Sequence, residues 1–458
     1  MIKHKLPDKL SRNWPYYGLA LLFIINLWLV WPGQMTPDSY TQYQEALTNT
    51  YSAAHPPLMS FVWHLCALVL TGSGLVCLLH LLLLYGACWT FMQSFKNSPL
   101  KFYYLIFPLL PAIAFYSSMI WKDVGLAFSY LAFSSGLTYF IIQEKKPSHS
   151  QYLVLILLLF YGTAVKFQAI YTAPGLILGL SFIWNNFKLN YKTWRTAIVG
   201  YLILCSSVLA VNQLLETPSA NKHWWQYVKI YDLAGISIAL NQPLFPDYIL
   251  QAKNFDFELI KQKFNYERVD DLVFFSDSPI VSTINIIDLQ NLLTHWRKAV
   301  YQHPLIYLQH RWHNWAKILF AKPLEKLDTL DFTQFKGLPW LANLNQVTSD
   351  QTNRIKISRS QKLAGCVSKV IFTVLKYFRY LLSFIFVFIF IIFSLIYGSF
   401  KLKNNYGLLL FIFSLTSLLL VLALFPFTMA SALRYVYMPV CLTYAAIPIA
   451  YRAILSRM

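Results

Sequence analysis

The sequence is dominated by apolar stretches that are each about as long as a lipid bilayer is thick. A helix needs about 20 apolar residues to cross the hydrocarbon layer, and in lipid only helices and closed barrels satisfy every backbone polar group. The pattern therefore predicts an all-α polytopic membrane protein with about ten transmembrane helices. The predicted spans are 15–31, 74–94, 101–118, 123–142, 151–165, 168–184, 196–214, 380–400, 406–426 and 432–451.

Composition excludes most other classes of protein. Only 12% of the 458 residues are charged and 57% are hydrophobic, whereas a soluble domain carries about 25% charged residues. The net charge of +19 does not indicate a nucleic-acid partner, because the basic residues lie between apolar runs, where they orient spans and contact anionic lipids. The six cysteines form no Cys-x-x-Cys pattern, so they imply neither a metal nor disulfides.

Basic residues also predict the orientation, which depends on the short apolar segment 56–71. If that segment crosses the membrane, basic loops fall on both sides. If it does not, 15 Lys and Arg residues of the termini and short loops share one side, and only three remain opposite. Because Lys and Arg favour the cytoplasmic side, we expect both termini in the cytoplasm and an interfacial or re-entrant helix at 56–71.

Two large features then face outward. The first is the loop 32–73, within an N-terminal transmembrane module at 1–214. The second is the polar stretch 215–367, which holds 14 of the 19 acidic residues and is predicted to form a small helical cap on the outer, periplasmic face. A basic stretch at 354–379 is interpreted as an amphipathic helix meeting outer-leaflet phosphates. The C-terminal helices occupy 368–458.

Six charged residues remain near the outer boundary of the spans. They are Asp38, Glu45, Asp123, Lys122, Lys166 and Arg434. An ionisable group at a membrane edge is costly to bury, so each is a candidate for function. Carboxylates and cations together indicate a general base beside an anion-binding site. Structural alternatives stay open: Asp38 as a helix cap, Lys166 as a residue snorkelling to the interface, and Arg434 as an anchor.

The loop 32–73 also contains His55, which starts the segment His-Pro-Pro-Leu. Proline suits the first helical position because its missing N–H has no partner there anyway. A structural role for this lone histidine is the simpler interpretation. The sequence has no HxxxH or HExxH pattern, so we predict no metal site. It has no Gly-rich phosphate loop either, and no cofactor or divalent cation is indicated.

Together these motifs resemble the GT-C membrane glycosyltransferases, such as protein O-mannosyltransferases and the lipid A aminoarabinose transferase. The pattern D-S-x3-Y-x3-L begins at Asp38, and the HPPL segment begins at His55. The resemblance implies that Asp38 is the catalytic carboxylate and that a juxtamembrane helix follows His55. Asp38 is followed by Ser39 rather than by a second acid, which departs from the family's usual acidic pair.

Three further positions match the family in chain order. Trp121-Lys122-Asp123 occupies the turn that carries a second acid, Lys166 lies in the turn between the fifth and sixth spans, and Arg434-Tyr435 precedes the last apolar run. The resemblance covers about 215 N-terminal residues and the last helix. It implies a GT-C-like bundle, with Asp123, Lys122, Lys166, Arg434, His55, Glu45 and Tyr435 binding substrate.

The expected activity is transfer of a sugar from a polyprenyl-phosphate donor to a surface glycan, lipid or protein acceptor, with inversion at the anomeric carbon. Two alternatives remain open. A transporter or flippase of a lipid-linked sugar would place charges near the bilayer midplane, often in repeated halves. A polysaccharide polymerase or ligase would use arginines of the outer loops, such as Arg297 and Arg311.

Overall fold

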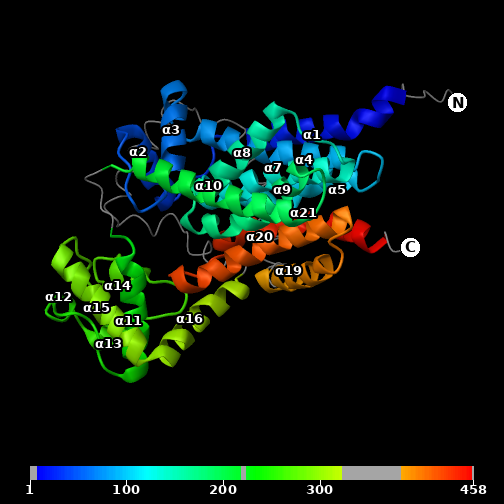
Figure 1. The fold of residues 1–458 in the computed structure, drawn as a ribbon. Helices are drawn as coiled ribbons and strands as arrows, with labels where there is room; N and C mark the ends of the chain where they lie inside the picture. The colour runs from blue at the N-terminus through cyan, green and yellow to red at the C-terminus, as the bar shows by residue number, and fades with distance from the viewer. Residues whose placement is uncertain (1–7, 218–222, 322–382, 456–458) are drawn as a thin grey trace.

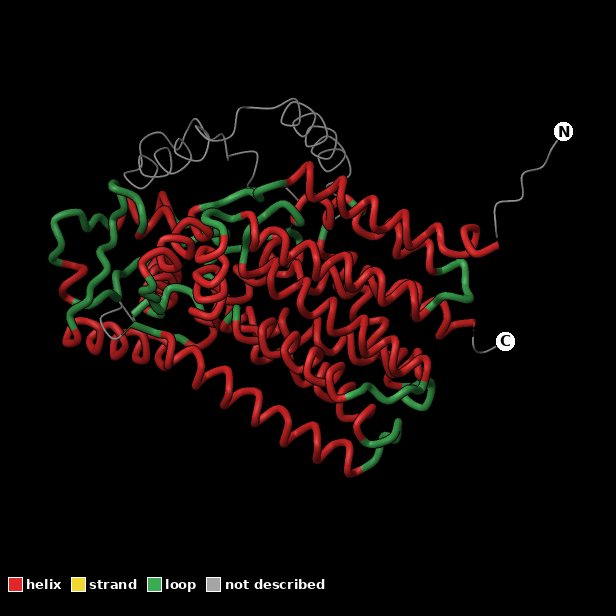
Figure 2. Tube along the Cα trace, turned by 90° about the horizontal axis from the view of Figure 1, so that it is seen from above, coloured by secondary structure: helices red, strands yellow, loops and turns green. Residues whose placement is uncertain are grey.

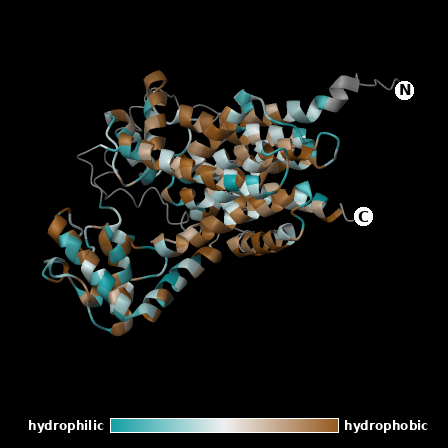
Figure 3. Cartoon of the chain, in the orientation of Figure 1, coloured by the Kyte–Doolittle hydropathy of each residue, from teal (hydrophilic) through white to brown (hydrophobic). Residues whose placement is uncertain are grey.

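A computed structural model describes residues 8–217, 223–321 and 383–455. Within these ranges the elements are helices, and extended pairing is limited to isolated bridges. Figure 1 shows a bundle of long helices with a smaller group of helices, the cap, beyond one end. In Figure 3 the bundle helices are largely apolar, whereas polar residues are frequent in the cap. The described part of the chain is therefore helical, with apolar helices suited to a membrane.

Among the described residues, seven helices are long and apolar enough to cross a bilayer. They coincide with seven of the predicted spans, including the first, second and last. Their elements are α1 (Asp8–Val30), α4 (Gly74–Ser94), α7 (Lys122–Gln143), η2 (Phe167–Thr172) with α9 (Ala173–Trp184), α10 (Tyr191–Leu215), α20 (Asn405–Phe427), and η4 (Leu433–Val436) with α21 (Tyr437–Leu455).

The other three predicted spans are shorter or interrupted elements. The segment 101–118 divides into α5 (Lys101–Ile106), η1 (Phe107–Leu109) and α6 (Pro111–Tyr116), because prolines at 108 and 111 each remove a backbone donor. The other two are α8 (His149–Ala164) and α19 (Phe384–Ser399), each of 16 residues. At 1.5 Å per residue such a helix is about 24 Å long. Residues 380–382 of the predicted span 380–400 lie outside the described residues.

Helix α7 is the centre of the bundle. Most of its residues are buried, whereas few residues of α1 and α10 are. Helices α4, α8 and α21 pack against α7, and Figure 2 shows the long helices running side by side. Because α7 starts at Lys122, its N-terminus brings two of the predicted site residues into the middle of one end of the bundle.

The loop between α1 and α4 forms two helices at that same end. They are α2 (Pro37–Thr48) and α3 (Pro57–Val69), which pack against each other. Helix α3 has 13 residues, too few to cross a bilayer, and in Figure 1 it stands across the direction of the bundle helices. This geometry suits the surface helix predicted at 56–71.

The cap has a separate apolar core. Its helices are α11 (Gln226–Leu240), α12 (Asp247–Leu250), α13 (Phe257–Lys263), α14 (Asp270–Val273), α15 (Ile286–Gln302) and α16 (Pro304–Leu319). Helix α16 returns to the bundle, where Trp315 Nε1 donates to the carbonyl of Val421 at 2.7 Å. The rest of the predicted 215–367 unit beyond residue 321, and the basic stretch at 354–379, lie outside the described residues.

The start of α1 and the end of α21 lie at one end of the bundle, and α2, α3 and the cap lie at the other (Figure 1). The predicted separation of the termini from the two large loops is therefore present in the fold. Reporter fusions after residues 72 and 97 measure which end faces the cytoplasm.

Candidate functional site

A short backbone pairing fixes the first loop against the start of α7. The Gln34 N–H donates to the carbonyl of Ser118 at 2.7 Å, and the Ile120 N–H donates to the carbonyl of Gln34 at 3.0 Å. Trp121 Nε1 donates to Thr36 Oγ1 at 2.6 Å, and the buried Ser39 hydroxyl donates to the carbonyl of Ile120. Residues that flank position 38 are thus tied to residues that immediately precede Lys122.

Asp38 lies in the first turn of α2, and its carboxylate faces the last part of the chain. Arg434 Nη1 donates to Asp38 Oδ2 at 2.9 Å. Both side chains keep some solvent access, 33% for Asp38 and 24% for Arg434. Burial by itself raises the pKa of Asp38, but the charges of Arg434 and Lys122 outweigh it and hold that pKa well below its usual value. Asp38 is therefore an anion at neutral pH.

Aromatic rings hold Arg434 in place. Its guanidinium carbon lies 5.2 Å from the centre of the Trp121 ring and 5.0 Å from that of Tyr435, within the range of cation–π attraction. Arg434 Nη2 also donates to the Tyr435 hydroxyl at 3.2 Å. The planar guanidinium is thus oriented toward the first loop, with N–H groups suited to an anion.

A second ion pair lies deeper in the cluster. Lys166, which follows α8, donates to Asp123 in the first turn of α7, and both side chains are almost fully buried. Lys166 Nζ also lies 3.5 Å from the carbonyl of Tyr435 and 5.2 Å from the centre of its ring. This pair therefore joins α7, the η2 turn and the segment that carries Arg434.

His55 contributes a neutral partner. Its Nδ1 lies 2.5 Å from Lys122 Nζ. Burial and the charge of Lys122 lower the pKa of His55 to about 3, so the imidazole is uncharged at neutral pH. The His55 ring then accepts a hydrogen bond from the Lys122 ammonium, which leaves two donor positions on that ammonium for other acceptors.

Seven of the eight predicted site residues therefore meet at one end of the bundle, and Glu45 has a separate position. Glu45 Oε1 accepts from the Ser52 N–H at 3.0 Å and from the Ser52 hydroxyl, and Glu45 Oε2 accepts from the Ser60 hydroxyl at 2.7 Å. These bonds tie α2 to the start of α3. In this structure, Glu45 supports the loop that carries Asp38.

Sequence reasoning did not single out Trp121 as a site residue. Its ring lies under Arg434, and its centre is 5.7 Å from that of the buried Tyr116. Its position directly before Lys122 and Asp123 is the feature of the sequence that could have indicated Trp121. A cation near an aromatic ring in a poorly hydrated place gains up to about 2 kcal/mol.

Arg311, considered for the polymerase alternative, has a different environment. It is fully buried in the cap, where it pairs with Asp232 at 2.5 Å and donates to the carbonyl of Thr428 at 2.7 Å. These contacts use Nη1 and Nη2, whereas the buried Nε has no hydrogen-bond partner among the described residues.

Within the described ranges, no group of three His, Cys, Asp or Glu side chains is arranged to hold a metal ion. Comparison of the chain with protein-family models, with curated proteins and with solved structures finds no match. The chemistry must therefore be argued from the geometry of the site itself.

Proposed function

We propose that this protein is a membrane glycosyltransferase of the GT-C type that transfers a sugar from a polyprenyl-phosphate donor to a glycan, lipid or protein acceptor. The observation that carries the proposal is the contact between Asp38 and Arg434 at 2.9 Å, beside Lys122 and the Lys166–Asp123 pair. A carboxylate next to several cations at one end of an apolar bundle provides both a base and a phosphate site.

The proposed reaction is a single displacement. The acceptor's oxygen or nitrogen attacks C1 of the sugar and forms the new glycosidic bond as the bond from C1 to the phosphate oxygen breaks. Polyprenyl phosphate leaves with the electron pair, and the anomeric centre inverts. Asp38 takes the proton from the attacking group. Arg434 and Lys122 stabilise the charge that develops on the leaving phosphate.

The Asp38–Arg434 contact is the resting arrangement in this mechanism. A bound phosphate competes with Asp38 for the guanidinium, and each N–H that turns to the phosphate weakens the hold on the carboxylate. Because that hold keeps the pKa of Asp38 low, donor binding raises the basicity of Asp38. The donor thus prepares the base before the acceptor reacts.

The Lys166–Asp123 pair has a supporting role in the proposal. Its burial and its bonds to the Tyr435 segment keep the start of α7 aligned with Arg434. Tyr435 and His55 then border the donor's sugar and phosphate. We place this site on the periplasmic face of a bacterial inner membrane, with both termini cytoplasmic, in accord with the distribution of Lys and Arg.

The position of the charges also bears on the alternatives. A transporter of a lipid-linked sugar needs a polar path across the bilayer, whereas the cluster lies at the start of α7, α2 and η4, all at one end of the bundle. For the polymerase or ligase, Arg311 is buried against Asp232. The transferase therefore accounts for more of the observed contacts.

The decisive experiment is Asp38→Asn in a strain that lacks the native copy. The amide cannot take a proton, so transfer should fall by about 100-fold or more, in the range lost with a general base. Surface glycans and lipid A are analysed for a missing sugar, and membrane abundance of the protein is measured in parallel. Glu258→Gln, which changes an exposed carboxylate of the cap, is the control and should leave transfer unchanged. Normal transfer by the Asp38→Asn protein would refute the proposal.

A further inference from the structure

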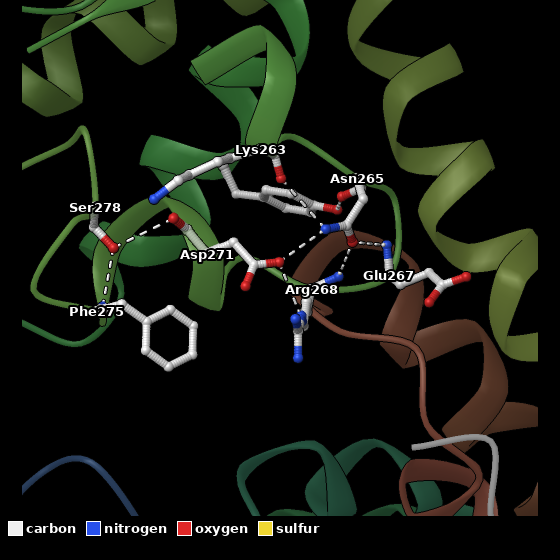
Figure 4. A network of polar contacts seen from close by, with 8 residues as sticks. Lys263, Asn265, Glu267, Arg268, Asp271, Phe275 and Ser278 are labelled. Atoms are coloured by element: carbon white, nitrogen blue, oxygen red, sulfur yellow. Dashed lines mark hydrogen bonds and ion pairs between the residues drawn. The ribbon is translucent and has the colours of Figure 1, made fainter. Parts of the chain in front are cut away.

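The cap contains a hollow that the proposed chemistry leaves unused. Its volume is about 370 Å³, and it opens to the surface between α13, α14 and the turns that connect them. Figure 4 shows the polar network around it. The lining residues are Gln262, Lys263, Phe264, Asn265, Asp271, Phe275 and Asp277. The volume is within the range of small-molecule sites.

Asn265 organises one wall of this hollow. Its Oδ1 accepts from the backbone N–H groups of Glu267 and Arg268, both at 2.9 Å. Its Nδ2 donates to Asp271 Oδ2 at 3.1 Å, and Arg268 Nε donates to the same oxygen at 2.9 Å. The turn at 265–268 is therefore fixed by side chains that border the hollow.

The carboxylates of the hollow keep acceptor capacity. Lys263 Nζ donates to Asp277 Oδ2 at 2.6 Å. Asn265 Nδ2 and Arg268 Nε donate to Asp271 Oδ2. Among the described residues these side-chain bonds end on Oδ2, and the Asp277 carboxylate also accepts from its own backbone N–H. Oδ1 of Asp271 is left for other donors, and a carboxylate can accept several hydrogen bonds. The Phe275 ring is 37% exposed and offers an apolar surface beside them.

The charge of the lining distinguishes the hollow from the Asp38 site. Lys263 and Arg268 balance the two carboxylates, on Asp271 and Asp277. The hollow therefore lacks the excess of positive charge that Arg434 and Lys122 offer to a phosphate. A ligand rich in hydroxyl groups donates to free carboxylate oxygens and places its C–H surface on an aromatic ring. A neutral carbohydrate has both features.

The hollow is also connected to the proposed active site. The Val269 N–H donates to the carbonyl of Met429 at 3.0 Å, and the Ser431 N–H donates to the carbonyl of Glu267 at 2.8 Å. Arg268 and Ala430 form an antiparallel bridge. The segment 429–431 leads directly into η4, which carries Arg434, so the turn that shapes the hollow also holds the backbone of the phosphate site.

We propose that the hollow at 262–277 binds a neutral carbohydrate, the glycan part of the acceptor, and that its turn holds the Arg434 segment while the acceptor is bound. The inference rests on the proposed transferase function and adds a substrate class and a place for it. Phosphate binds at the inner cluster, and the sugar acceptor binds at the cap.

The test measures binding directly, with the full chain in lipid nanodiscs. Saturation-transfer NMR is recorded with neutral tetrasaccharides of glucose, galactose and N-acetylglucosamine, and with inorganic phosphate and putrescine as charged probes. The variants are Phe275→Ala and Asp277→Asn. A matched control is Glu258→Gln, because Glu258 and Asp277 are exposed alike, at 72% and 74%, and each lies 2.6 Å from a lysine of α13. Tyr301→Ala controls for an exposed ring.

We expect at least one tetrasaccharide to bind the unmodified chain and both controls, and to bind about tenfold more weakly to Phe275→Ala and Asp277→Asn, a loss of about 1.4 kcal/mol. The inference is overturned if no tetrasaccharide binds or if all variants bind a tetrasaccharide equally. It is also overturned if Phe275→Ala and Asp277→Asn weaken binding of phosphate or putrescine rather than of a tetrasaccharide. Asp38→Asn separates the two proposals, because it should abolish transfer and leave tetrasaccharide binding intact. Normal transfer by this variant would refute the proposed transferase, whereas a failure of the binding result would refute the hollow as a carbohydrate site.

Discussion

Arg434 and Asp38 are 396 positions apart in the chain, yet Arg434 Nη1 lies 2.9 Å from Asp38 Oδ2. This contact joins the first loop to the beginning of the last helix. Because both side chains are partly exposed, an ion pair of this kind adds about 0 to 1 kcal/mol to stability. Its main consequence is for charge at the proposed site, since it places an arginine and a carboxylate where a donor and an acceptor can reach them.

Replacement of Arg434 by Gln should therefore affect transfer far more than folding. We expect the transfer rate to fall by about 100-fold or more, as when other charge-stabilising donors are removed, with a change in unfolding free energy of at most about 1 kcal/mol. Arg297→Gln changes an exposed arginine of the cap and serves as the control. Glycan analysis and thermal unfolding in nanodiscs measure the two effects. If Arg297→Gln abolishes transfer and Arg434→Gln does not, the ligase model replaces this one.

The Lys166–Asp123 pair should show the opposite balance. Both side chains are nearly inaccessible, at 4% and 3%, so loss of one partner leaves a buried charge without its counter-ion, at a cost of about 3 to 5 kcal/mol. Lys166→Met and Asp123→Leu should each lower the unfolding temperature strongly, and the double variant should recover part of the loss. Lys261→Met, from the more exposed pair with Glu258, should change little. Additive single losses in the double variant would contradict the expected coupling.

His55 predicts a pH dependence with a definite sign. Its pKa is lowered to about 3 in the folded chain, against about 6.5 when unfolded. The unfolded chain therefore binds the proton more readily, and stability falls as the pH decreases from about 6.5 toward 3. NMR of labelled histidine should show a neutral His55 ring at pH 5. Lys122→Met removes a charge that lowers this pKa, so the ring should then titrate at higher pH. An imidazolium at pH 6 in the unmodified protein would exclude the contact as described.

Close helix packing gives a prediction independent of function. A Cβ on Gly175 of α9 would lie 2.4 Å from Thr416 Oγ1 and 2.9 Å from the carbonyl oxygen of Ile412 in α20. Gly175→Ala must then push two helices apart, and overpacking of this kind costs about 1 to 3 kcal/mol. Gly86→Ala is the matched control, because nothing lies within 4 Å of a Cβ added there. Thermal unfolding of both variants decides the point, and equal unfolding temperatures would show that α9 and α20 do not approach this closely.

The orientation of the chain in the membrane is tested with reporter fusions after residues 72 and 97. The two points flank α4 (Gly74–Ser94), which is long and apolar enough to span. We expect a periplasmic signal after 72 and a cytoplasmic signal after 97. The reverse pattern would move the Asp38 site to the cytoplasmic face, and signals on the same side would show that α4 does not cross.

Much of the helical architecture could be predicted from the apolar pattern. Continuous runs such as 74–94 and 406–426 became the long helices α4 and α20 with almost the same bounds, because lipid leaves a backbone few alternatives. The interruptions were harder to predict. Apolarity indicated one span at 101–118, but two prolines divide it into three short elements, and apolarity does not register the loss of backbone donors.

The candidate site was predicted in part, for a similar reason. The cost of charges at a membrane edge singles out Asp38, Lys122, Asp123, Lys166 and Arg434 from sequence alone. Glu45 met the same criterion, yet Ser52 and Ser60 occupy its carboxylate. Nothing in the local sequence distinguishes a carboxylate that faces a cluster from one that ties two helices together, because the difference lies in the side chains that approach from elsewhere.

The sequence by itself determined that the chain is a set of apolar helices and that its few membrane-edge charges are exceptional, since both follow from the cost of placing polar groups in lipid. Tertiary structure decided which side chains pair: Arg434 with Asp38, Lys166 with Asp123, and the Lys122 ammonium with the neutral His55 ring. These pairings depend on the close approach of segments far apart in the chain, at the Gln34–Ser118 pairing and the Arg268–Ala430 bridge. Distances of a few ångströms between such segments are set by packing in three dimensions, which no local pattern encodes.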